Sequence, residues 1–439
     1  MGKKTLIAAV TLSATVLMAG CGGGGGSDTG KEPDLSKFPL YNENYAALEY
    51  GADDYAKNLS APYWLGNVIY NEIALPVLYD NGECYAKLLY APEKVISVRD
   101  RTLTVAYEEG KDYTVDKANK RIIVPQTSSI ATWRDGIDEG RNVPEEFNRV
   151  DSWTAMDWVD DYVIWDPAGK GQSVYAESPV FYGKYLSITY AYNVSDLPEN
   201  IYHNFDKWKL TGIRNKLQSG QNITLAVLGD SITEGCSSSE KLSAVLGQTV
   251  LPNSPCYARQ LKNEIERVYG VEVNFVNAGV GGSNSGDLFN ATSAVGPKTM
   301  QLYAQAKQAV PDLCVIAYGT NDVGVNDEFE FAENIERAIT EMRAVSADCQ
   351  FILVNAFPCN PLVEQKSGMY QKFLAKMNAI AAEYDDGSVA VVDLHKVGEY
   401  MLQTKRYCEL SSSNVNHPND FMHRTYAMSI MSALCDYKK

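Results

Sequence analysis

Five short apolar runs alternate with helical stretches over the second half of this chain, and that alternation limits its fold more than any other feature. The apolar runs cover residues 224–228, 273–276, 313–318, 351–354 and 389–393. The helical stretches cover residues 256–269, 300–309, 329–345, 369–384 and 420–437. Apolar strands that alternate with helices are typical of a parallel sheet covered on both faces. We therefore predict an α/β domain whose ligand site lies at the carboxyl ends of its strands.

Small and polar residues follow the first three predicted strands, and a fourth segment of this kind precedes the last helix. These segments are GDSITEG at 229–235, NAGVGG at 277–282, GTND at 319–322 and NVNHPND at 414–420. Ser231 begins a turn just past the end of a strand, where a serine side chain can act as an exposed nucleophile. Because Thr233 occupies the last position of the pattern, the first segment is not a G-x-S-x-G elbow. Asp230 and Glu234 are expected to fix this turn.

These four segments resemble, in order, the blocks of the GDSL, or SGNH, hydrolase family. The resemblance covers about residues 220–439. It implies a flavodoxin-like three-layer α/β/α fold with a five-stranded parallel sheet at residues 215–439. It also implies an esterase that uses Ser231 as nucleophile and His417 as base, with no metal or organic cofactor. The oxyanion hole would consist of the N–H groups of Ser231 and Gly282 and the side-chain amide of Asn321.

The resemblance implies acyl transfer through a covalent intermediate. Serine is a weak nucleophile at neutral pH and needs a base within hydrogen-bond reach. His417 would accept the proton of Ser231 and then return it to the leaving alcohol. Each oxyanion donor in such a site typically contributes about 2.7–4 kcal/mol to transition-state stabilisation.

One position departs from the family pattern. The usual block is Asp-x-x-His, and here Asn414 occupies the aspartate position. Three interpretations stay open. Asn414 orients His417 as a neutral partner; a backbone carbonyl does so, which gives a Ser–His dyad; or another carboxylate, with Asp420 nearest in sequence, takes the role. The other histidines, His203, His395 and His423, are given structural roles.

Residues 37–205 are rich in short apolar or aromatic runs separated by turn residues, which is typical of a β domain. The sequence DNG at 80–82 predicts a hairpin, and residues 107–124 predict a second one. Residues 183–192 alternate between apolar and polar side chains and predict a half-buried strand. We predict an N-terminal β-sandwich, jelly-roll-like, as an accessory domain. All six tryptophans precede residue 210, and packing in a β core is the commoner role for such residues than a sugar platform.

The first 20 residues resemble a bacterial lipoprotein signal. Lys3 and Lys4 precede an apolar stretch at residues 6–19, which leads to Gly20 and Cys21. The stretch is too short for an ordinary membrane span. The resemblance implies that Cys21 is lipidated, with residues 21–36 as a glycine-rich tether. We expect an exported lipoprotein anchored in a membrane, at the cell surface or the periplasmic face; a plain signal peptide is the alternative.

Charge and cysteine content exclude several classes of function. The formal net charge of −16 argues against nucleic acid as a partner, since such proteins carry basic surfaces. The 439 residues contain nine cysteines but no CxxC pair, HExxH motif or Cys/His cluster, so no metal site is predicted. Cys314 and Cys435 lie in apolar runs and are expected to be buried thiols.

Three features favour a carbohydrate substrate. They are the predicted export, the added β domain, and the lack of a long apolar lid in the active-site segments. We therefore expect an acetylated polysaccharide or oligosaccharide, from which the enzyme removes O-acetyl groups. The alternatives are a lipid-directed esterase, lysophospholipase or thioesterase, and a non-catalytic carbohydrate-binding lipoprotein at the cell surface. Only Asn414 favours the last one.

Overall fold

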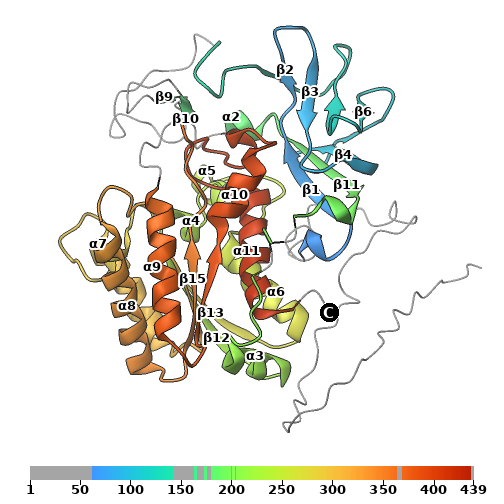
Figure 1. Cartoon of the computed structure of the whole chain (residues 1–439). Coiled ribbons are helices and arrows are strands. Elements are labelled where there is room, and N and C mark those ends of the chain that lie inside the picture. Colours follow the sequence, from blue (N-terminus) through green and yellow to red (C-terminus); the bar gives the residue numbers. More distant parts are fainter. Residues whose placement is uncertain are drawn as a thin grey trace, which may run out of the picture.

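The computed structural model describes residues 62–142, 163–165, 173–175, 179–198, 200–202, 204–362 and 368–436. Figure 1 shows an α/β body with a smaller β region packed against one side of it. The predicted signal and tether lie outside the described residues, as do Cys21, Trp153, Trp158 and His203. No helix in the described residues is long and apolar enough to cross a membrane.

The α/β body contains the predicted five-stranded parallel sheet. Its strands are β12 (Ile223–Gly229), β13 (Val273–Gly279), β14 (Leu313–Ala317), β15 (Gln350–Asn355) and β16 (Val389–Asp393). They lie in the order β13-β12-β14-β15-β16, and every neighbouring pair is parallel. The chain leaves β12 toward one edge and returns to its other side at β14. In sheets of this kind ligands bind beside such a reversal, at the carboxyl ends of the strands.

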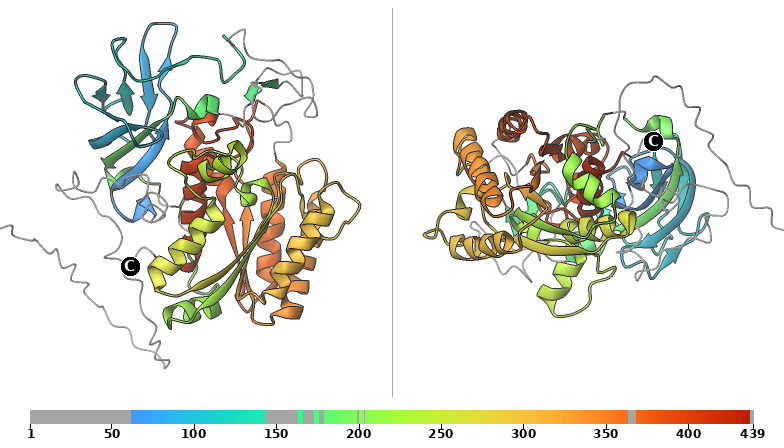
Figure 2. Two further views of the ribbon diagram at one scale, coloured as in Figure 1. Left: turned by 180° about the vertical axis from the view of Figure 1, so that it is seen from behind. Right: turned by 90° about the horizontal axis from the view of Figure 1, so that it is seen from below.

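Helices cover both faces of this sheet (Figure 2). One face packs against α7 (Gly296–Gln308), α8 (Glu328–Val345) and α9 (Met369–Glu383). The other packs against α3 (Thr211–Gln218), α6 (Tyr257–Tyr269), α10 (Leu394–Leu402) and α11 (Asp420–Leu434). Strand β12 contributes Leu225 and Val227 to one core and Ala226 and Leu228 to the other, as the two-residue period of a strand requires. The three-layer α/β prediction is therefore confirmed.

Four helices of the α/β body lay outside the sequence prediction: α3, α10, and the short α4 (Ser231–Glu234) and α5 (Ser239–Leu246). Each has fewer than ten residues, which is too short for a helical period to stand out. Short 3-10 turns occur at Tyr63–Leu65, Val194–Asp196, Ser285–Leu288 and Tyr407–Glu409.

The N-terminal β region contains two larger sheets. One has the order β1 (Val68–Ala74), β11 (Leu186–Tyr192), β4 (Pro92–Asp100) and β5 (Ala106–Tyr107). The other has the order β6 (Thr114–Asp116), β7 (Arg121–Ile123), β3 (Cys84–Lys87), β2 (Val77–Leu78) and β8 (Trp133–Arg134). Both predicted hairpins are present, as the antiparallel pairs β2–β3 and β6–β7. A further pair joins β9 (Val163–Trp165) and β10 (Ser173–Tyr175), and α2 (Pro179–Tyr182) precedes β11.

Strand β11 corrects one expectation. The alternating sequence predicted a half-buried strand, but all seven residues of β11 are buried. The strand lies between β1 and β4, and both of its faces are covered. Ile188 and Tyr190 face the main core, whereas Ala191 packs with Val68 and Leu103 in a second small core. Among its polar residues, Thr189 is buried with hydrogen bonds to Asn71.

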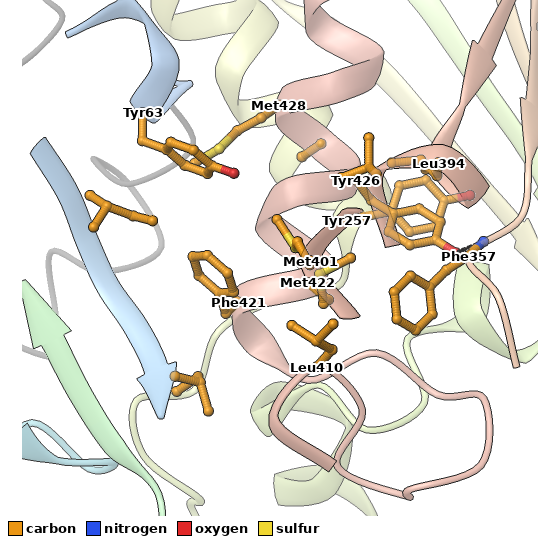
Figure 3. Close-up of a cluster of buried hydrophobic side chains, with 14 of the residues drawn as sticks. Tyr63, Tyr257, Phe357, Leu394, Met401, Leu410, Phe421, Met422, Tyr426 and Met428 are labelled. Carbon is orange, nitrogen blue, oxygen red and sulfur yellow. Dashed lines mark hydrogen bonds between the residues drawn. The ribbon is translucent and has the colours of Figure 1, made fainter. Parts of the chain in front are cut away.

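One hydrophobic core extends from the β region into the α/β body. Figure 3 shows Tyr63 from the β region beside Phe421 and Met428 of α11. The rings of Tyr63 and Phe421 are stacked, with centroids 6.3 Å apart. The guanidinium of Arg424, also on α11, donates to the carbonyl of Tyr70 in β1 at 2.5 Å. The two regions are therefore joined by shared packing rather than by a linker alone.

The tryptophans and cysteines of the described residues have mostly structural surroundings. Trp133 is buried against Phe181, and Trp64 stacks on Tyr202, whereas Trp208 is 72% exposed. All eight described cysteines are free thiols, and Cys314 and Cys435 are buried as expected.

Candidate active site

Ser231 lies at the carboxyl end of β12, as the first residue of the short helix α4. The carboxylate of Asp230 caps this helix by accepting from the N–H of Ile232 at 2.9 Å. The helix lies directly on the strand ends, because a Cβ at Gly229 would come 2.1 Å from Thr233 Oγ1, and one at Gly279 would come 2.2 Å from the Glu234 nitrogen. These glycines therefore permit the close packing that presents Ser231 at the edge of the sheet.

His417 lies on the segment between α10 and α11, three residues before α11 begins. Its Nε2 is 2.8 Å from the Oγ of Ser231, which is a hydrogen bond of ordinary length. The backbone around it is fixed by two serine hydroxyls. Ser413 Oγ accepts from the N–H of His417 at 3.1 Å, and Ser411 Oγ donates to its carbonyl at 2.7 Å. The structure therefore brings together two side chains that are 186 residues apart in sequence.

Gly282 lies in the turn after β13 and has a φ of +77°, which glycine adopts without strain. The preceding residue, Gly281, donates its N–H to Glu234 at 2.6 Å, and a Cβ there would be 3.9 Å from the Cβ of Ser231. Glu234 also pairs with Lys241 at 3.0 Å and with Lys298 at 3.4 Å. Glu234 thus ties this turn to the turn of Ser231, which is the turn-fixing role expected from the sequence.

Asn321 follows β14, the strand on the other side of β12. One N–H of its side-chain amide donates to the carbonyl of Ser283 at 3.0 Å, so the loop that contains Gly282 orients this amide. Beneath it, Asp322 is buried and accepts from the Ser285 N–H at 3.1 Å and from Asn326 at 2.7 Å. The loops after β13 and β14 are therefore joined by a polar network, and an Asn amide has a second N–H for another acceptor.

Buried ionisable groups surround the Ser231 turn. Burial raises the pKa of Asp230 to about 7, although the nearby His417 opposes the shift. Burial also raises the pKa of Asp322. Behind the site, His423 of α11 is buried with its Nε2 3.1 Å from the carbonyl of Cys236, and burial lowers its pKa to about 4. Asp230 bonds to Ile232 within this turn and His423 bonds to Cys236 just after it, which fits the structural role given to His423.

Asn414 and Asp420 have different surroundings. Asn414 is buried and donates its Nδ2 to the carbonyl of Asp138 at 2.8 Å. Asp420 accepts from the N–H of Ser239 at 2.8 Å, and burial raises its pKa to about 6. The structure therefore places Asp420 as a partner of Ser239.

Sequence reasoning missed the contact of Asn414 with Asp138. The two residues are 276 positions apart, and nothing in the local sequence of Asp138 indicates this contact. Within the described part of the chain, no group of His, Cys, Asp and Glu side chains is arranged to hold a metal ion.

Residues 227–425 match the model of the GDSL-like Lipase/Acylhydrolase family. No curated protein matches the chain. Among solved structures, a two-domain esterase active on acetylated mannans is 20% identical, with a TM-score of 0.36; the match covers 53% of this chain and 54% of that one. This chain thus matches about half the length of that esterase.

Two further solved structures are similar to this chain. A carbohydrate esterase of family 3 from Talaromyces cellulolyticus is 15% identical, with a TM-score of 0.35, over 47% of this chain and 94% of that one. An acetylxylan esterase from Geobacillus stearothermophilus is 17% identical, with a TM-score of 0.36, over 49% of this chain and 95% of that one.

Proposed function

Since residues 227–425 match the model of the GDSL-like lipase/acylhydrolase family, we propose that this chain is a serine esterase that removes O-acetyl groups from carbohydrate. The observation that carries the proposal is the 2.8 Å contact between Ser231 Oγ and His417 Nε2 at the carboxyl end of the sheet. A nucleophile in hydrogen-bond reach of a base is the minimal apparatus for covalent acyl transfer.

The chemistry follows from this pair. Nε2 of His417 takes the proton of Ser231 while Oγ attacks the acetyl carbonyl carbon. The tetrahedral intermediate collapses, the bond from carbon to the sugar oxygen breaks, and Nε2 returns the proton to that oxygen. Water, activated in turn by His417, then cleaves the acetyl-serine ester and releases acetate.

The negative oxygen of the intermediate would be held by three donors. They are the N–H groups of Ser231 and Gly282 and the second N–H of the Asn321 amide. Among the described residues, neither of the two backbone N–H groups donates to a protein acceptor. The hydrogen bond from Asn321 to Ser283 orients the amide before substrate arrives, and donors arranged in advance are the effective ones.

A short acyl group on a carbohydrate fits what surrounds these residues. The loop that contains Gly282 continues with the half-buried polar residue Asn284, whereas Ser283 and Ser285 are buried and bond within the protein. The predicted export and the attached β region also favour an extracellular glycan. We propose further that Cys21 carries a lipid that anchors the protein in a membrane, with the sugar polymer outside.

A lipid-directed esterase is the second candidate. Its support is three exposed apolar side chains that follow β14 and β15 in the chain: one on the loop after β14, one in the first turn of α8 and one on the loop after β15. Val325 is 64% exposed, Phe329 65% and Leu362 41%. Such residues could receive a longer acyl chain, so the length of the preferred acyl group separates the two candidates.

The test is the hydrolysis of p-nitrophenyl esters of increasing acyl length, followed by acetate release from acetylated xylan and mannan. Preference for acetate and release from a glycan would support the proposal. Preference for long chains would support the lipid-directed alternative, and no turnover would indicate a non-catalytic binding protein. Ser231→Ala is the inactive reference, and Ser243→Ala on α5 is the matched control, since Ser243 bonds to the carbonyl of Ser239 on the same helix.

A further inference from the structure

The segment at residues 405–419, which joins α10 to α11 and contains His417, is held by the N-terminal β region; we call it the His417 segment. At its start, Lys405 Nζ lies 2.8 Å from Glu72 Oε1 and 3.3 Å from Glu409 Oε1. All three side chains are at most 2% exposed. Glu409 also accepts from the N–H of Leu75 at 2.9 Å. A buried ion network therefore joins this segment to β1.

A second connection involves Arg406 and the turn at residues 135–142, which follows β8. Arg406 Nη1 donates to both carboxylate oxygens of Asp138, at 2.9 and 3.1 Å. Its Nη2 donates to Asp135 in the same turn. One guanidinium thus bridges two carboxylates, a geometry that the planar fork of arginine allows and a lysine ammonium does not reproduce.

The third connection is Asn414, which is 1% exposed and has a φ of +60°. Its Nδ2 donates to the carbonyl of Asp138 at 2.8 Å. From the other side, Asn360 Nδ2 donates to the carbonyl of Asn414 at 2.7 Å. Asn414 is therefore clamped between the β region and the loop after β15.

Asn414 is connected to the imidazole of His417 through a short stretch of hydrogen-bonded backbone. The hydroxyl of Ser413 accepts from the N–H groups of Val415 and His417, at 3.3 and 3.1 Å. Only two residues separate Asn414 from His417. A shift of Asn414 would therefore move Nε2 of His417 relative to Ser231, and a misplacement of about 1 Å can lower the rate about 100-fold.

We propose that Asp138, Arg406 and Asn414 are positioning residues for His417, so that the N-terminal β region completes the active-site geometry of the α/β body. The inference rests on the proposed esterase function. It also gives a reason for the asparagine at residue 414, because a carboxylate could not donate to the carbonyl of Asp138. The β region then contributes to catalysis by positioning His417, in addition to any role in binding a glycan.

The experiment compares Arg406→Gln with the matched control Arg121→Gln in the full chain, using p-nitrophenyl acetate. Arg121 pairs with Asp116 inside the β region, and the two arginine side chains are 21% and 20% exposed. Below the melting temperature of both variants, we expect kcat of Arg406→Gln to fall by about 10- to 100-fold with KM unchanged. We expect Arg121→Gln to retain the wild-type kcat, and Arg406→Lys to recover only part of the loss.

Asn414→Asp provides a second test that keeps the size of the side chain. It restores the residue more usual at this position of the family block, yet we expect kcat to fall, because the donor to Asp138 is lost. Wild-type kcat in a folded Arg406→Gln, or in Asn414→Asp, would overturn the inference while the wild-type enzyme remains active. A wild-type chain that hydrolyses no ester would refute the proposed function itself, so the two failures are distinguishable.

Discussion

The two halves of the candidate active site are built in different ways. The turns that hold Ser231, Gly282 and Asn321 follow adjacent strands of one parallel sheet and are fixed by contacts within the α/β body, such as Glu234 to Gly281. The His417 segment is also held from outside that body, by Glu72, Asp135 and Asp138 of the β region. The comparison teaches that the proposed nucleophile and oxyanion donors are positioned by the sheet itself, whereas the proposed base also contacts a second region of the chain through its segment.

The largest effect is expected where the two halves meet. Ser231→Ala and His417→Ala should each lower kcat by on the order of 10⁴-fold or more, because either change removes the proton transfer that activates the nucleophile. The double variant should be no worse than either single one, since the two residues act as a unit. Steady-state hydrolysis of p-nitrophenyl acetate measures these values of kcat. If the loss in the double variant equalled the product of the two single losses, the two residues would act independently.

On the strand-end side, Asn321→Ala should lower kcat by about 10²- to 10³-fold, the usual cost of removing one oxyanion donor. KM should change little, because the missing hydrogen bond is made mainly to the transition state. Asn334→Ala is a suitable control, since this amide on α8 donates to Ser285 behind the same loop. An equal loss in both variants would mean that Asn321 supports the loop and does not contact the oxyanion.

The buried Asp230 in the Ser231 turn should also make the free energy of unfolding depend on pH. Burial raises the pKa of Asp230 to about 7, against about 3.9 in an unfolded chain. Between these values the folded state holds a proton that the unfolded state releases, so the contribution of this group to stability falls as pH rises from about 4 to about 7. Relative to Asp230→Asn, the wild type should lose on the order of a few kcal/mol across this range.

Urea unfolding of both proteins at several pH values measures that difference. Asp420 and His423 titrate in both proteins and cancel in the comparison. An asparagine at residue 230 can still accept from the N–H of Ile232, so the cap is kept. Parallel stability curves for the two proteins would show that Asp230 is ionised throughout the range.

The smallest effect on kcat is expected from truncation of the Asn414 side chain. Asn414→Ala should lower kcat by about 10-fold, since it removes one of several connections of the His417 segment. Assays of Asn414→Ala beside Ser231→Ala, on the same substrate and with folding checked by circular dichroism, measure this. If Asn414→Ala were as inactive as Ser231→Ala, Asn414 would be an essential partner of the imidazole and not one connection among several.

The difference between the strand-end turns and the His417 segment also explains how much of the site could be predicted from the sequence. Apolar strands followed by small polar residues predict the parallel sheet and place Ser231, Gly282 and Asn321 at one edge, because these signals are local. Asp138 lies 276 residues from its partner Asn414 and carries no local signal. The alternating sequence of β11 predicts a strand with one buried and one exposed face. It carries no signal that a second small core covers the other face, so the complete burial of β11 could not be predicted.

The central claim is that Ser231 is a nucleophile activated by His417. Incubation with a fluorophosphonate, followed by intact mass measurement and peptide mapping, tests it most directly. The account predicts one phosphonyl group per chain, attached to Ser231, and its loss in both Ser231→Ala and His417→Ala. An unlabelled wild-type chain, or a label on another residue, would contradict it.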